Sequence, residues 1–158
     1  MAKPGFLAKL VKEGKLGMVE PSEEIKSSYI RKSESYLESA RILLEKGKLE
    51  ESVSMAYYSM YHMLTALLFR TGIKCENHSA SITLLKEVFG IDNSEISRTK
   101  YERVDKEYYV DFQITRDEVV KIIGRAEGFN SSLLDFISRM NAGKIKMFRI
   151  RMESLLRE

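Results

Sequence analysis

The stretch Ala56-Tyr57-Tyr58-Ser59-Met60-Tyr61-His62 lies inside the longest segment of the sequence without a charged residue, residues 52–69. Apolar side chains fall on almost every side of a helix drawn over residues 49–71, so we expect a central helix covered by several neighbours. Ser, Tyr, His and Thr interrupt the segment, which favours a buried core helix over a membrane span. The tyrosines are expected in the core or in a dimer seam. Any binding surface is expected beside this helix rather than on it.

Helical spacing continues on both sides of this segment. We expect a first helix from about Pro21 to Lys46, antiparallel to the central helix across a short turn at Gly47. Downstream, Asn77 is a candidate N-cap of a short helix, and a weaker, polar helix covers residues 94–108. Thr115-Arg116-Asp117-Glu118 is a capping box that opens another strong helix. No strand is expected. The sequence therefore predicts an all-α fold, an antiparallel bundle of four or five helices over residues 21–142.

The two ends of the chain differ from this body in charge. The net charge of the chain is +3. Residues 1–20 form a basic arm that we expect to be loosely attached, and residues 143–158 form a basic helix. Solubility and helix-end chemistry are the favoured explanation of these charges, with contact to nucleic acid as the alternative.

Composition excludes several classes of protein. A single cysteine, Cys75, rules out an intrachain disulfide, and the two histidines, His62 and His78, do not form a metal site by themselves. No signal peptide, nucleotide-binding loop, nucleophile elbow or metal-binding motif is found. We expect a cytoplasmic protein that needs no membrane, metal or cofactor.

Three segments together carry a family resemblance. Residues 56–68, AYYSMYHMLTALL, resemble the family pattern A-Y-Y-A-M-F-H-A-A-R-A-L-L, and residues 72–79, GIKCENHS, resemble its G-I-x-x-x-T-H-S/K loop. Residues 114–119, ITRDEV, followed by 126–129, AEGF, resemble its last core helix. Over about residues 21–140 the chain resembles the HEPN family, in particular its small prokaryotic members.

The resemblance implies a helical bundle, often a homodimer, that works with a minimal nucleotidyltransferase in a toxin–antitoxin-like pair. Many HEPN proteins are metal-independent ribonucleases that use an Arg and a His separated by four to six residues. Such a His would move a proton while the Arg stabilised the charge of the phosphorane.

This sequence departs from the ribonuclease pattern. No Arg precedes a His with four to six residues between them; Arg70 and His78 are separated by seven. Where the family motif is expected, the sequence has Arg103 and Tyr108, and a tyrosine with an ordinary pKa of about 10 is a poor base near neutral pH. The favoured hypothesis is a non-catalytic module that binds a nucleotide or RNA, and the alternative is a divergent endoribonuclease.

The candidate residues are few. Arg103 and Tyr108 are the weak catalytic candidates. Arg70, His78, Ser79 and Arg103 are the candidate ligand-binding residues, because a helix N-terminus such as that behind Asn77 favours anions. Each has a structural alternative: His78 could order the loop, Arg70 could offset the helix dipole, and Arg103 could pair with Asp111.

Overall fold

Two long antiparallel helices form the spine of the molecule. The computed structural model describes residues 4–108 and 113–157, with the side chains of Pro4 and of 104–108 outside this description. Helix α2 (Glu23–Glu45) begins where the Ser22 hydroxyl accepts a hydrogen bond from the backbone N–H of Ile25. Helix α3 (Leu49–Thr71) ends at Gly72, whose φ of 76° is the left-handed conformation of a helix C-cap. The helix bounds predicted around the central stretch are therefore confirmed.

The seam between α2 and α3 is held by small polar residues. The Ser33 hydroxyl donates to the Ser59 carbonyl at 2.7 Å, and the Ser59 hydroxyl donates to the Ser33 carbonyl at 2.7 Å. Ser52 donates to the carbonyl of Ala40, also at 2.7 Å. All four residues are fully buried, so their small side chains let the two helices approach closely without leaving a hydroxyl unsatisfied.

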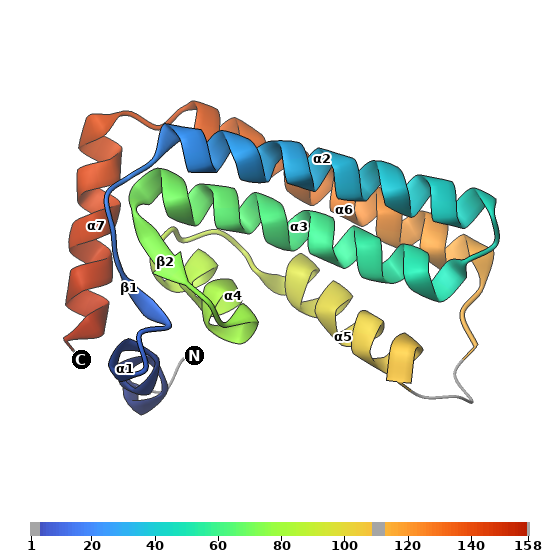
Figure 1. The fold of residues 1–158 in the computed structure, drawn as a ribbon, viewed down its shortest axis with the longest axis horizontal. Helices are drawn as coiled ribbons and strands as arrows, with labels where there is room; N and C mark the ends of the chain where they lie inside the picture. The colour runs from blue at the N-terminus through green and yellow to red at the C-terminus, as the bar shows by residue number, and fades with distance from the viewer. Residues whose placement is uncertain (1–3, 109–112, 158) are drawn as a thin grey trace.

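Three further helices surround α3: α4 (His78–Glu87), α5 (Ser94–Tyr108) and α6 (Arg116–Ser138). Figure 1 shows α2, α3 and α6 running lengthwise, with α4 and α5 along the other side of α3. Thr115 caps α6, as predicted, by accepting a hydrogen bond from the N–H of Glu118. The residues of α3 that are fully inaccessible to solvent include Val53, Ala56, Tyr57, Met60, Leu64, Ala66 and Leu67.

The two ends of the chain pack together at one end of the bundle (Figure 1). Strand β1 (Leu16–Met18) pairs in antiparallel register with β2 (Ile73–Cys75), with Leu16 opposite Cys75. The prediction that no strand forms was therefore wrong. Each strand has only three residues, too few for an alternating pattern to stand out from the flanking glycines.

The N-terminal segment is also more firmly attached than expected. Helix α1 (Pro4–Lys12) buries Leu7 and Leu10, and β1 buries Leu16. Helix α7 (Ala142–Leu156) covers the same end of the bundle through Phe148 and Met152. Apolar burial therefore joins both ends to the core.

Arg149 of α7 ties this end together. Its guanidinium donates to the carbonyls of Val19 at 2.8 Å, Thr71 at 2.9 Å and Gly72 at 3.2 Å. A Cβ on Gly72 would collide with Arg149 and with the Val19 carbonyl, so this position requires glycine for space as well as for its φ.

No helix in the described residues has both the length and the apolar character that a membrane crossing needs.

Candidate functional site

His78 is held by two tyrosines of the central helix. The Tyr57 hydroxyl and His78 Nδ1 are 2.9 Å apart and share a hydrogen bond. The Tyr61 ring stacks on the His78 ring, with centroids 3.7 Å apart and planes inclined by 17°. The Tyr61 hydroxyl also lies 3.2 Å from the Ser81 hydroxyl. One side of α3 therefore fixes both the position and the orientation of the imidazole.

The local sequence explains why His78 faces α3. Gly72 ends α3, and β2 carries the chain back alongside it. The Asn77 side chain then accepts a hydrogen bond from the N–H of Ala80 at 2.9 Å and starts α4, so His78 is the first helical residue. The predicted N-cap is confirmed.

Two cations of α5 flank the imidazole on the other side. The Arg103 guanidinium lies 5.0 Å from the centroid of the Tyr58 ring and 5.7 Å from that of Tyr57, within range of a cation–π contact. Lys100 Nζ donates to the Ser79 hydroxyl at 2.7 Å. Residues 100 and 103 are three apart on α5, so both side chains leave the same side of that helix.

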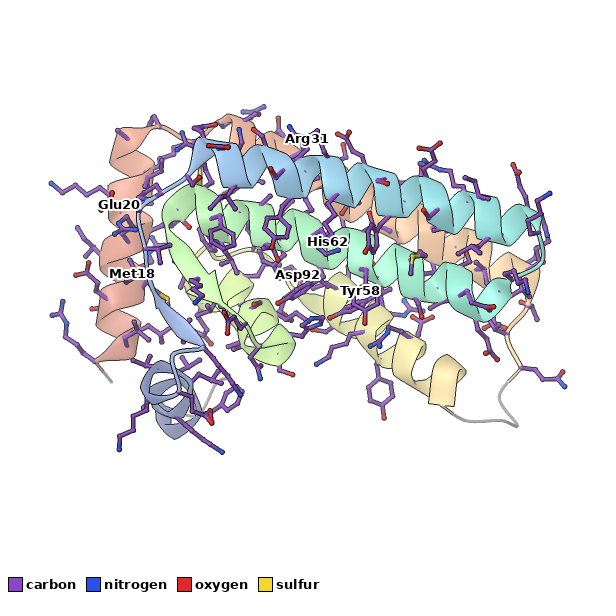
Figure 2. All side chains as sticks on the ribbon, viewed as in Figure 1. Met18, Glu20, Arg31, Tyr58, His62 and Asp92 are labelled. Atoms are coloured by element: carbon purple, nitrogen blue, oxygen red, sulfur yellow. The ribbon has the colours of Figure 1, made fainter. Side chains whose placement is uncertain are left out.

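A cleft of about 310 Å³ opens beside His78. Its walls come from α2, α3 and β2 with the residues that follow it, and Figure 2 labels His62, which lies on α3 within it. Inside the cleft, the Tyr29 and Phe69 rings are nearly parallel, with centroids 5.7 Å apart. We call this hollow the aromatic cleft; its lining residues are Tyr29, Lys32, Tyr61, His62, Thr65, Phe69, Lys74, Cys75, Glu76 and His78.

His62 is a neutral ring packed among aromatic ones. The Tyr36 ring meets it edge-on, with centroids 4.7 Å apart. Burial, followed by the electrostatic effects of Lys32 and His78, lowers the pKa of His62 to about 4. Among the described residues, nothing hydrogen-bonds to the buried His62 Nδ1.

The pKa values of the His78 group fix its charge state. Burial, then the charges of Lys100 and Arg103, lower the pKa of His78 below its ordinary value, so the ring is neutral at neutral pH. Burial is the main reason that the pKa values of Tyr57 and Tyr61 are raised, so both stay protonated. The positive charge of the site therefore comes from lysine and arginine rather than from imidazole.

Comparison of the sequence with known protein families identifies the family of this chain. A model of the HEPN domain matches residues 27–135. The chain belongs to the HEPN family. The match runs from α2 to the last turn of α6, which confirms the resemblance drawn from the sequence and the expected all-α fold of a HEPN domain.

Three relatives share the name UPF0332 protein. The Pyrococcus horikoshii protein, PH1297, is 47% identical over 62 residues, which are 39% of this chain and 43% of that protein. The Archaeoglobus fulgidus relative is 32% identical over 63% of this chain and 85% of its own length. The Thermotoga maritima relative is 26% identical over 75% of this chain and 92% of its own length. The chain thus spans less than half of the first relative and most of the other two.

This HEPN domain brings together three of the four predicted ligand-binding residues. His78 and Arg103 both contact Tyr57 and Tyr58. Ser79, next to His78, accepts a hydrogen bond from Lys100 on the same face of α5 as Arg103. Arg70 does not join them: its Nε pairs with Glu23 at 2.8 Å, and it is not among the residues that line the aromatic cleft.

The second catalytic candidate, Tyr108, is the last residue of α5, but its side chain lies outside the described residues, as does Asp111. The predicted pairing of Arg103 with Asp111 therefore stays a prediction.

Several residues of the site were missed from the sequence. Lys100 was treated only as part of a polar helix, although its spacing of three from Arg103 would have indicated a shared face. Lys32 and Tyr29 come from α2, and nothing local in the sequence shows that they face His62. The tyrosines of α3 were expected to serve the core, and Tyr57 and Tyr61 do so with their rings while their hydroxyls face His78 and Ser81.

Proposed function

We propose that the protein is a non-catalytic HEPN binding module that holds a nucleotide or single-stranded RNA at the aromatic cleft and the adjacent Lys100–Arg103 face. The observation that carries this proposal is the position of Arg103 and Lys100 beside the stacked Tyr61 and His78 rings. Guanidinium and ammonium groups bind phosphate, and exposed aromatic faces bind unpaired bases. The site offers the cations beside His78 and the partly exposed rings of Tyr29, His62 and Phe69 in the adjoining cleft.

Equilibrium binding to a fluorescent single-stranded RNA tests this proposal. Lys100→Ala should weaken binding about tenfold, because Nζ donates to Ser79 near the imidazole and makes no ion pair with any side chain that the structure describes. Arg98→Ala is the matched control, since it removes one charge from the exposed side of the same helix. Equal affinities of the two variants would contradict the proposal. Competition by a mononucleotide distinguishes a nucleotide site from a longer RNA site.

The absence of catalysis is tested separately. The sequence lacks the Arg–His spacing of the ribonuclease members, so purified protein should leave total RNA intact. Clean cleavage that disappears in Arg103→Ala would overturn the non-catalytic assignment.

A divergent endoribonuclease is the second candidate, favoured by one observation. His78 and Arg103 both contact Tyr57, and the imidazole is neutral at neutral pH, the form that accepts a proton. Cleavage with an essential His78 and Arg103 would support it. The idea fails if His78→Ala and Arg103→Ala leave any cleavage activity unchanged.

Membership of the HEPN family supports a proposal about the setting in which the protein works. We place the protein in the cytoplasm as a homodimer that works with a minimal nucleotidyltransferase in a toxin–antitoxin-like pair. Co-purification of the chain with a nucleotidyltransferase encoded beside it is the expected result. Size-exclusion chromatography of the purified chain tests the dimer.

A further inference from the structure

The outer side of α7 exposes apolar side chains that no element of the described residues covers. On its inner side, Ile145, Phe148 and Met152 are buried against the bundle. On its outer side, Met147 is 43% and Ile150 is 57% exposed. Figure 1 shows α7 lying across the end of the bundle, at its outer edge. The helix therefore has a second apolar side that the fold itself does not use.

The shape of this side suits a helix. Two apolar hollows, of about 470 Å³ and 390 Å³, lie along α7, and Lys146 and Ile150 line both. Ile150 is thus a ridge between two depressions, one reaching toward Pro21 and the other toward Gly143. Ridges that fit between the side chains of a facing helix are the usual geometry of helix packing.

The charge of this side is positive along both edges of the stripe. Lys146 lies on one edge and Lys144 on the other, and both are exposed. Neither lysine makes an ion pair with any of the side chains that the structure describes, which are those of residues 5–103 and 113–157. The acidic residue nearest the stripe, Glu153, is paired with Arg157 at 3.6 Å. A ligand of this surface must therefore supply negative charge on both sides of an apolar centre.

We propose that the outer side of α7 binds an amphipathic helix of a partner protein, with an apolar stripe seated over Ile150 and acidic residues facing Lys144 and Lys146. Nucleic acid would satisfy the lysines but would leave Met147 and Ile150 uncovered. A lipid surface would leave the hollows beside Ile150 unfilled. An acidic helix satisfies the charge and the shape together.

This surface is separate from the proposed ligand site. The two hollows share no lining residue with the aromatic cleft. Helix α7 also lies outside the residues that match the HEPN domain, 27–135. The inference therefore stands whether or not the aromatic cleft binds RNA.

Binding of a synthetic peptide to the full chain tests the inference. The probe is a helical peptide with a leucine stripe flanked by glutamates, and its matched control carries lysines in place of the glutamates. Ile150→Glu should weaken binding of the acidic peptide at least about tenfold. Val120→Glu is the control variant, because Val120 is 50% exposed on α6 and lies away from this surface. Circular dichroism verifies that each variant is folded.

Charge reversal sharpens the test. The double variant Lys144→Glu/Lys146→Glu should lose the acidic peptide and bind the lysine peptide instead. Failure of the wild-type chain to bind the acidic peptide, or equal binding by Ile150→Glu, would overturn the proposal. So would an Ile150-dependent dimer, or Ile150-dependent sedimentation with vesicles of phosphatidylcholine and phosphatidylglycerol, in the absence of peptide binding. Those results would assign the surface to a second copy or to lipid.

Discussion

Helix α3 has two polar regions that differ in their relation to solvent. Toward α2, Ser33, Ser52 and Ser59 are fully buried and bond to backbone carbonyls across the seam. Around His78, the polar atoms belong to aromatic rings that line the aromatic cleft between α2, α3 and β2, and Lys100 and Arg103 of α5 lie near the same imidazole. Figure 2 shows Tyr58 and His62 on α3, near the residues of this second region.

The comparison shows that the buried seam serves the fold, whereas the aromatic cleft is open to a ligand. Small hydroxyls in a closed seam set the distance and register of two helices, and no ligand can reach them. Large rings beside a hollow leave faces and cations that a ligand can reach. The central helix thus specifies the bundle through its buried seam with α2 and lines the candidate site with its aromatic residues.

The largest expected effect lies in the seam. Ser59→Leu should reduce the free energy of unfolding by about 3 kcal/mol, because the added side chain forces α2 and α3 apart and breaks the reciprocal hydrogen bonds. Urea denaturation measures the loss. Ser35→Leu, on the exposed side of α2, is the control and should stay within about 0.5 kcal/mol of the wild type. Similar losses of unfolding free energy in both variants would contradict the importance assigned to the seam.

The next effect is a pH dependence that belongs to the cleft. The pKa of His62 is about 4 in the folded chain against an ordinary 6.5, so the unfolded chain binds a proton first as the pH falls. Stability should be full above pH 6.5 and decline between pH 6.5 and 4, by about 1–2 kcal/mol once solvent screening of this half-buried ring is allowed for. Urea denaturation across this range measures it. His62→Phe should flatten the decline; an unchanged pH profile in that variant would contradict the assignment.

A smaller effect comes from the hydrogen bond between Tyr57 of α3 and His78 of α4. Tyr57→Phe leaves the ring in the core but removes the partner of His78 Nδ1, at a cost of about 1 kcal/mol. Because His78 is then less firmly oriented, RNA binding should weaken by a factor of about 3. The free energy of unfolding is measured by urea denaturation, and the RNA affinity is measured by fluorescence anisotropy on the same protein preparation. An affinity that does not change would show that the orientation of His78 is unimportant for binding.

The smallest expected effect is an increase in RNA affinity. Glu76 pairs with Lys74 at 3.2 Å, and both residues line the aromatic cleft with side chains that are about half exposed. Glu76→Gln frees the lysine for phosphate and should tighten RNA binding about twofold while leaving stability within about 0.5 kcal/mol. Weaker binding would contradict the positive character assigned to the cleft.

The sequence predicted what depends on local patterns. The C-cap at Gly72, the N-cap at Asn77 and the capping box at Thr115 each follow from a few neighbouring residues, and all three are confirmed. The β1–β2 pair depends on residues more than fifty positions apart, and the Arg149 contacts join α7 to both, so no local signal could predict them.

The candidate site was also only partly predictable from local sequence. His78 and Arg103 were recognised through family motifs, but Lys32 and Lys100 reach it only through tertiary packing. The expectation that a binding surface lies beside the central helix stays a prediction. The aromatic cleft is lined by Tyr61, His62 and Thr65 of α3 itself, not only by elements beside that helix.

The salt dependence of RNA binding tests the central claim most directly. A phosphate contact at Lys100 releases counterions, so the slope of log K against log salt should become less negative by about 0.7 in Lys100→Ala, with no such change in Arg98→Ala. An identical slope in wild type and Lys100→Ala would show that no phosphate binds beside His78, and would contradict the account.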